Sequence, residues 1–282
     1  MSPTVVLVHG AFANSFSFAP LQAELALRGL RSLAVDLPGH GFAATYPAEY
    51  QAPQDLAGLA TAPGAIKGVT LADNAAHVIG VLERVREHGP VVLVGHSRGG
   101  VTLTAVANAR PDLVDRLVYV SAWAPVDLDV GDYYAEPEMA SFDATAVAGA
   151  MVANPADVGL LRSNFRTADP GVLAGLKAAF LADGTDDELR AFLATFQPDE
   201  NLDAGSPDDR AQAATWGTVP RAYVRLSEDA SMPLAMQDRL IREGDALTPD
   251  NPYVVRTLPS SHLSWLVHPA PAADVLAELA AR

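Results

Sequence analysis

Short runs of apolar, mostly β-branched residues alternate along the chain with segments of helical periodicity. The runs at 4–8 and 91–94 are almost wholly apolar, which is typical of strands buried on both faces of a parallel sheet. Between them, residues 71–88 carry an apolar residue every three or four positions, as an amphipathic helix does. Such alternation requires right-handed crossovers, with helices on both sheet faces. The chain is therefore predicted to be α/β, with a doubly wound, mostly parallel sheet of about six strands.

The same patterns predict where each element lies. The run at 30–35 is expected to be a second buried strand, and Thr70 and Asp73 are expected to cap the helix that follows them. The predicted strands are 4–8, 30–35, 91–94, 117–121, 221–226 and 253–258, and the main predicted helices are 16–27, 71–88, 170–181, 186–195, 236–243 and 270–281.

Strand patterns are missing from about residue 126 to residue 215, although helical patterns continue there. Residues 1–125 and 216–282 are therefore predicted to form one core domain, and 126–215 a helical lid inserted in it. Residues 42–69 are irregular and contain several prolines and glycines. A loop of this length is uncommon in a compact domain. Two interpretations stay open for it, a rim of the functional site and a mobile surface insertion.

Composition excludes several classes of protein. The chain has 282 residues, of which 49% are hydrophobic and 19% charged, so it is not intrinsically disordered. It has no cysteine, which excludes disulfides, thiol catalysis and Cys-ligated metals. Its formal net charge of −15 argues against binding to nucleic acid or to anionic membranes.

Long apolar runs are also missing from the sequence. No run approaches the roughly 20 residues that cross a bilayer, and the first apolar run is too short for a signal-peptide core. We therefore expect a cytoplasmic protein with no membrane partner. The expected partners are a small-molecule substrate and, at most, a second copy of the chain in a homodimer.

The sequence Gly95-His96-Ser97-Arg98-Gly99 fits the pattern G-x-S-x-G. It follows a predicted strand directly and precedes a helix that is expected to reach about residue 109. This context is the one in which the pattern forms a nucleophile elbow, with the serine hydroxyl raised above the sheet. Ser97 is therefore predicted to be a nucleophile, against the simpler interpretation of a helix N-cap.

A serine hydroxyl needs a base. Among seven histidines, His262 lies just beyond the sixth predicted strand. The loops after parallel strands share one edge of the sheet, so His262 is expected to reach Ser97. The base in turn needs a carboxylate. Asp229, in the loop after the fifth strand, is the predicted acid, and Glu228 and Asp127 are the alternatives.

Acyl transfer also places negative charge on the former carbonyl oxygen, for which two backbone N–H donors are expected. Arg98 follows the nucleophile, and Ala11 lies in the loop after the first strand, so their amides are the predicted oxyanion hole. The side chain of Arg98 is expected to be a surface group at the start of the helix.

With these residues in place, the chain resembles the α/β-hydrolase superfamily. Its nearest likeness is to the group of salicylate methyl esterase and the related hydroxynitrile lyases. The resemblance covers residues 3–125 and 216–282, and it implies that Asp229, not Glu228, is the acid. The matching stretches are Val5-Val6-Leu7-Val8-His9-Gly10-Ala11, Val91-Val92-Leu93-Val94-Gly95-His96-Ser97, Tyr223-Val224-Arg225-Leu226-Ser227-Glu228-Asp229 and Ser261-His262.

Two departures from that group bear on the reaction. The lyases carry a threonine after the first-strand histidine and a lysine after the catalytic histidine, where this chain has Gly10 and Leu263. The resemblance thus favours hydrolysis of a carboxylic ester through an acyl-enzyme intermediate. Lactone, amide or C–C bond hydrolysis with the same triad is an alternative, and a non-catalytic ligand receptor on this fold is another. No metal or cofactor is expected, since no H-E-x-x-H pattern or phosphate-binding loop occurs.

Aromatic residues near the strand ends suggest the substrate. They would suit a small to medium apolar or aromatic acyl or alcohol group, although core packing is the commoner role of such side chains. The residues expected to line the substrate pocket are Gly10, Phe12, Trp123, Leu263 and Trp265.

Overall fold

The computed structural model describes residues 2–281. Within this range the main sheet has six strands in the order β2-β1-β3-β4-β7-β8, and every neighbouring pair is parallel. The order reverses beside β1, which is the mark of a doubly wound sheet. The predicted α/β class is confirmed. The strands of this sheet are β1 (Thr4–Val8), β2 (Arg31–Val35), β3 (Val91–Ser97), β4 (Arg116–Ala122), β7 (Arg221–Leu226) and β8 (Val254–Leu258).

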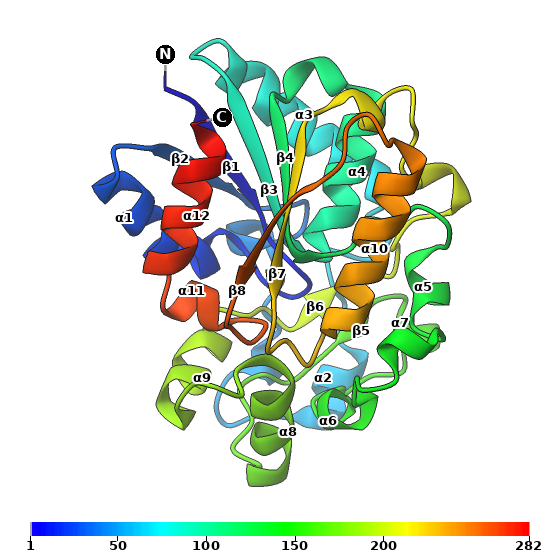
Figure 1. Cartoon of the computed structure of the whole chain (residues 1–282). Helices are drawn as coiled ribbons and strands as arrows, with labels where there is room; N and C mark the ends of the chain where they lie inside the picture. The colour runs from blue at the N-terminus through cyan, green and yellow to red at the C-terminus, as the bar shows by residue number, and fades with distance from the viewer. Residues whose placement is uncertain (1, 282) are drawn as a thin grey trace.

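Helices cover both faces of the sheet (Figure 1). One core cluster joins α3, α4 and α10 to one face, and a second joins α1 and α12 to the other. In β1, successive residues alternate between the two clusters and all are buried, which explains the continuous apolar run. The helices outside the inserted segment are α1 (Ala19–Leu27), α2 (Leu56–Thr61), α3 (Leu71–Arg86), α4 (Gly99–Ala109), α10 (Leu234–Leu247), α11 (Ser264–Val267) and α12 (Ala270–Ala280).

Local chemistry sets the ends of these helices. Thr70 and Asp73 form the predicted capping box at the start of α3, where the Asp73 amide donates to Thr70 Oγ1 at 3.1 Å and the Thr70 amide donates to Asp73 Oδ2 at 2.9 Å. The chain leaves α1 through Gly29, whose φ of +75° falls in the left-handed region. Both features could be read from the sequence.

Strand β2 differs from its prediction as a buried strand. It lies at the edge of the sheet, and Arg31 and Leu33 are exposed, with only Val35 buried. An edge strand has a partner on one side only, so its apolar residues are covered incompletely. The run of apolar residues identified the strand correctly but not its place in the sheet.

Residues 126–215, hereafter the inserted segment, connect β4 to β7 and lie beyond the carboxyl ends of the strands (Figure 1). The segment also contains a two-stranded antiparallel sheet, which the sequence patterns did not show because each strand has two residues. Its elements are α5 (Val130–Tyr133), α6 (Ala144–Ala148), α7 (Pro155–Val158), β5 (Leu161–Arg162), α8 (Pro170–Phe180), α9 (Asp186–Leu193) and β6 (Asp199–Glu200).

The irregular stretch 42–69 packs against the inserted segment. The Arg162 guanidinium on β5 donates to Leu59 O at 2.7 Å and to Ala62 O at 2.5 Å. Tyr50 and Ile66 are buried. This stretch therefore packs against the inserted segment, and it contributes no residue to the lining of the cavity beside Ser97 that is described below.

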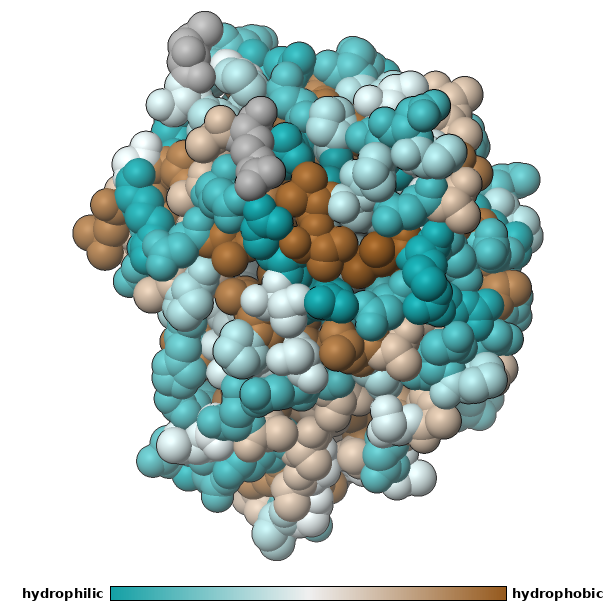
Figure 2. Space-filling model, in the orientation of Figure 1, coloured by the Kyte–Doolittle hydropathy of each residue, from teal (hydrophilic) through white to brown (hydrophobic). Residues whose placement is uncertain are grey.

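The face of the molecule in Figure 2 is largely hydrophilic. Figure 2 shows hydrophilic side chains over most of one face, with hydrophobic side chains in scattered patches between them. Across residues 2–281, no helix combines the length and the apolar character that crossing a membrane demands.

Candidate active site

Ser97 ends β3 on a sharp turn into α4. Its φ is +53°, in the left-handed region that residues with a side chain rarely adopt. The turn also requires the glycines on both sides of Ser97, because a side chain at either position would collide with neighbouring atoms. A Cβ on Gly95 would lie 2.7 Å from Leu103 Cδ1, and one on Gly99 would lie 2.6 Å from the carbonyl oxygens of Val8 and His9. The predicted strand–turn–helix elbow is thus the local structure, held in a strained conformation that is common at functional sites.

The loop after β1 passes directly beside the serine. A Cβ on Gly10 would lie 2.9 Å from Ser97 Cβ and 3.3 Å from His96 O. Only a glycine therefore fits here without movement of the elbow. Ala11 and Arg98 line the same cavity as the serine.

His262 and Asp229 form a buried pair. His262 Nδ1 lies 2.6 Å from Asp229 Oδ2, and both residues are at least nine-tenths buried. Asp229 Oδ1 accepts the amides of Ser231 and Met232 at 2.8 and 2.9 Å. The carboxylate is therefore an acceptor toward His262, which places the ring proton on Nδ1. His262 Nε2 is then the basic nitrogen.

Ser121 adds a further donor to this pair, one that the sequence analysis did not identify. Its hydroxyl donates to Asp229 Oδ2 at 2.6 Å. In the β3–β4 register, His96 pairs with Val120 and Ser97 with Ala122, so Ser121 is an extra residue in a bulge with φ of +39°. Bulges of this kind redirect a side chain beside an active site. The sequence showed only a serine at a strand end, which carries no such signal.

The two alternative acids lie elsewhere. Glu228 and Asp127 are exposed, whereas Asp229 is buried against His262. The geometry brings Asp229 and His262 together and leaves the alternatives in solvent.

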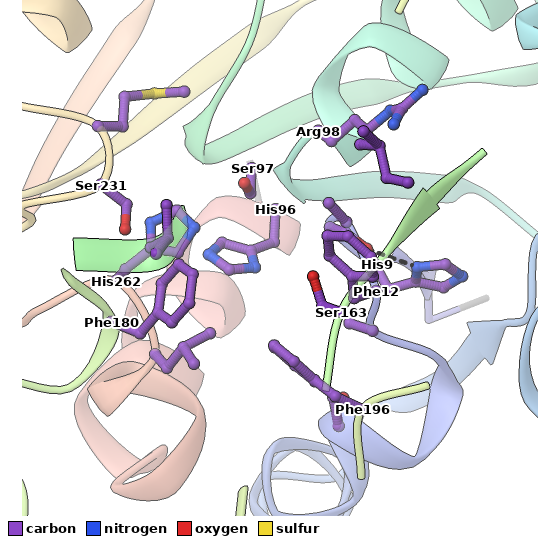
Figure 3. A pocket seen from close by; sticks show the side chains of 18 of the residues that line it. His9, Phe12, His96, Ser97, Arg98, Ser163, Phe180, Phe196, Ser231 and His262 are labelled. Carbon is purple, nitrogen blue, oxygen red and sulfur yellow. Dashed lines mark hydrogen bonds between the residues drawn. The ribbon is translucent and has the colours of Figure 1, made fainter. Parts of the chain in front are cut away.

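A cavity of about 380 Å³ opens beside the serine. Figure 3 shows Phe180 beside His262, with Ser97 on the same cavity and Phe12, Ser163 and Phe196 on its other side. Of the residues expected from the sequence, Gly10, Ala11, Phe12, Ser97, Arg98, Trp123, His262 and Leu263 line it. The apolar lining also includes Phe142, Phe165, Phe192, Val147, Leu176 and Leu161, all from the inserted segment.

Trp265 was expected in the pocket but is not part of its lining. It is buried, and its ring packs 5.3 Å from the His96 ring and 6.3 Å from the Phe18 ring, centroid to centroid. Trp265 therefore packs behind the elbow as a core residue, the commoner role of a tryptophan.

The Arg98 side chain is not the surface group that the sequence suggested. Its Nη1 donates to Asn201 O at 2.8 Å, and its Nη2 donates to Asn201 Oδ1 at 2.7 Å and to Asp203 O. The guanidinium is partly buried and joins the elbow to the inserted segment. Because these partners lie about a hundred positions away in the sequence, no local pattern indicates them.

The end of α8 holds the loops that carry His262 and Asp229. Ala179 O accepts the Ser231 hydroxyl at 2.7 Å, and Phe180 O accepts the Leu263 amide at 2.9 Å. Asp183, just beyond α8, accepts the hydroxyl of Ser261. The inserted segment is thus bonded to two of the loops that form the site.

His9, which follows β1 and lines the same cavity, is a neutral ring. The Leu37 amide donates to His9 Nε2 at 3.2 Å, so His9 Nδ1 carries the proton toward Gly10 O at 2.9 Å. Burial and the nearby His40 lower the pKa of His9 to about 3. The folded protein therefore keeps this histidine uncharged at neutral pH.

This neutral histidine should make the fold sensitive to acid. An unfolded histidine takes up a proton near pH 6.5, whereas folded His9 does so only near pH 3. His9 therefore contributes stability above pH 6.5 that is lost as pH falls from 6.5 toward 3, at about 1.4 kcal/mol per pH unit. We expect His9→Gln to flatten the pH dependence of the unfolding free energy between pH 6 and 4, measured by urea denaturation.

The exposed His77 provides the matched control for His9. His77→Gln should leave the slope unchanged. An unchanged slope in His9→Gln as well would show that His9 is not the group responsible.

These observations identify the family. A family model described as the alpha/beta hydrolase family matches residues 5–277. The chain therefore belongs to the alpha/beta hydrolase family, as the resemblance predicted.

Proteins named as a hydrolase and as esterases are similar to this chain. A pyrethroid hydrolase from Sphingobium wenxiniae is 25% identical over 280 residues, which are 98% of this chain and 87% of that protein. A carbendazim hydrolyzing esterase from Nocardioides is 32% identical over 120 residues, 43% of this chain and 42% of that esterase. The crystal structure of polyneuridine aldehyde esterase superposes with a TM-score of 0.71 at 19% identity and covers 99% of each chain, a likeness that shows the fold alone.

Proposed function

We propose that this protein is a serine hydrolase that cleaves carboxylic esters through an acyl-enzyme intermediate. Ser97 is the nucleophile, His262 the general base and Asp229 the acid that orients it. The observation that carries the proposal is the buried Asp229–His262 pair, 2.6 Å apart, on a cavity shared with a serine at a strained elbow. The relatives named as a hydrolase and an esterase support the same reaction.

In the first half of the reaction, Ser97 Oγ attacks the ester carbonyl while its proton passes to His262 Nε2. The C=O electron pair moves to the oxygen, which the amides of Ala11 and Arg98 stabilise. The tetrahedral intermediate collapses, the C–O bond to the alcohol breaks, and the alcohol leaves with the proton from His262. Asp229 stabilises the imidazolium throughout.

In the second half, a water molecule gives a proton to His262 Nε2 and attacks the acyl-enzyme carbonyl. A second tetrahedral intermediate forms at the same amides. Its collapse breaks the bond to Ser97 Oγ, which regains the proton, and releases the acid. Both halves require an Nε2 without a proton at the start of the step, and the hydrogen bond from His262 Nδ1 to Asp229 holds the ring in that tautomer.

The cavity indicates the substrate. Its lining is largely aromatic and aliphatic, and much of it comes from the inserted segment. Burying apolar surface there stabilises a bound ligand by roughly 25 cal/mol per Å², whereas a charged group would lose its hydration without a partner. We infer that an uncharged, small to medium apolar or aromatic ester is the preferred substrate, and that residues 126–215 act as a lid over it.

The proposal is tested with a panel of p-nitrophenyl and methyl esters whose acyl groups range from acetyl to benzoyl and decanoyl. We expect kcat/KM to rise with apolar acyl size until the cavity is filled, and to fall at least 10-fold when a carboxylate is placed on the acyl chain. The measurement is initial rates by absorbance or pH titration.

Matched lactone and amide substrates serve as the comparison. Faster turnover of a lactone than of any open ester would move the proposal to that alternative. Tight binding of the apolar ligands without turnover would favour a receptor on this fold.

A further inference from the structure

The inserted segment holds both polar groups of the Phe12 peptide backbone. The Phe12 amide donates to Glu200 Oε2 at 2.9 Å, and Phe12 O accepts the Gln197 amide at 3.0 Å. Phe12 has φ of +59°, in the left-handed region. Such a conformation persists only where surrounding contacts fix it. The neighbouring residue along the chain is Ala11, whose amide we assigned to the oxyanion hole.

Glu200 is nearly inaccessible and lies at the centre of a charged cluster. Its Oε1 accepts the Asn201 amide at 2.8 Å and lies 3.7 Å from Arg98 Nη1, and its Oε2 lies 3.2 Å from His40 Nε2. Burial opposes the ionised form, but the charges of Arg98 and His40 hold the pKa of Glu200 at about 2. Glu200 is therefore ionised. Its contacts with Arg98 and His40 depend on the negative charge, and its hydrogen bonds with the amides of Phe12 and Asn201 depend on the carboxylate oxygens.

The same short stretch also binds the other oxyanion residue. Arg98, whose amide is the second assigned donor, places its guanidinium on Asn201 and Asp203. Thus residues 197–203 bond to the loop after β1 on one side and to the elbow on the other. The mechanism above uses none of these side chains.

We propose that Glu200 is a positioning residue that sets the geometry of the oxyanion hole from the inserted segment. This inference rests on the proposed function. The carboxylate fixes the Ala11–Phe12 peptide through the Phe12 amide and fixes the elbow through Arg98. Because the Phe12 amide is bonded to Glu200, it is not free for the reacting oxygen, and the Ala11 amide is the donor that we assign to this loop. The catalytic core is incomplete without β6.

If Glu200 positions the oxyanion hole, it stabilises the transition state and does not contribute to binding of the substrate in its ground state. Oxyanion donors act only when they lie within hydrogen-bond distance of the developing charge, and a displacement of about 1 Å costs up to roughly 100-fold in rate. Removal of the carboxylate should therefore lower kcat and leave ground-state binding in the apolar cavity unchanged.

The experiment compares Glu200→Ala and Glu200→Gln with Asp199→Asn. Asp199 is the matched control, since it is buried on the same strand and pairs with Arg162 at 2.6 Å, with no contact to the loop after β1 or to the elbow. The readouts are kcat and KM on the best ester, the inhibition constant of phenylboronic acid as a tetrahedral oxyanion analogue, that of the alcohol product, and Tm.

We expect Glu200→Ala to lower kcat about 10- to 100-fold, with KM and alcohol inhibition within about twofold. The affinity for phenylboronic acid should fall by a similar factor. Glu200→Gln, which keeps an acceptor for the Phe12 amide, should recover part of the loss. Asp199→Asn should lower Tm and leave kcat within about twofold.

Two results would overturn the proposal. In the first, all three variants lose kcat in proportion to Tm, which would make Glu200 a structural residue only. In the second, Glu200→Ala keeps full kcat and boronate affinity. A wild-type protein that hydrolyses no ester of the panel would instead contradict the proposed function, and this inference with it.

Discussion

Ser97→Ala is expected to lower kcat on the best ester by about 10⁶-fold, the scale seen when a triad serine is removed from a well-studied protease. The hydroxyl supplies the only bond-forming oxygen of the proposed first step. The alanine keeps the shape of the elbow, because it too fits the space left by Gly95 and Gly99. KM and binding of the alcohol product should change little. Stopped assays with concentrated enzyme measure the residual rate.

Ser163→Ala is the matched control for this substitution. Ser163 lines the same cavity, and its hydroxyl contacts Met151 Sδ at 3.1 Å instead of the Asp229–His262 pair. Its removal should leave kcat within a fewfold of the wild type. Retention of more than about 1% of the wild-type rate by Ser97→Ala would mean that another group performs the attack.

The sheet could be predicted because its signal is local. Each strand that is buried on both faces, such as β1 at 4–8 and the first part of β3 at 91–94, needs a continuous apolar run, and such runs are visible without knowledge of the partner strands. The edge position of β2 could not be inferred, since its run resembles a buried one. The two-residue strands β5 and β6 are too short for any periodicity to appear.

The candidate site likewise contains residues that the sequence could predict and residues that it could not. Ser97, His262 and Asp229 each follow a predicted strand, so the topology alone brings their loops to one edge of the sheet. Glu200 and Ser121 have no such signal. In a chain with 34 acidic residues, a glutamate in a helical region is most simply a solvated side chain. Its role depends on contacts with Phe12 and Arg98, more than 100 positions away.

The sequence could not show which of the aromatic residues near the strand ends line the pocket. Phe12 and Trp123 line the cavity, whereas Trp265, on the short helix α11 just after His262, is buried behind the elbow. Whether an aromatic side chain faces a cavity or a core depends on tertiary packing. About half of the residues that line the cavity come from the inserted segment, where the resemblance to known families gave no detail.

Asp229→Asn should lower kcat by about 10⁴-fold, the cost of the equivalent change in a well-studied triad. The structure explains why an amide, nearly identical in shape, fails here. The amides of Ser231 and Met232 both donate to Oδ1, so the oxygen of an asparagine would stay there. Its NH₂ group would then face His262 Nδ1 and donate to it. Burst kinetics with a p-nitrophenyl ester would measure the acylation step directly.

That reversed hydrogen bond forces the ring proton onto His262 Nε2, the nitrogen that must accept the proton of Ser97. Asp229→Asn therefore lowers kcat because it selects the wrong tautomer of His262, whereas the fold and the cavity stay unchanged. For that reason Tm should fall by only a few degrees. Glu228→Gln, at the exposed neighbouring carboxylate, should keep kcat within about twofold. The opposite pattern, a large loss in Glu228→Gln and a small one in Asp229→Asn, would transfer the role of the acid to Glu228.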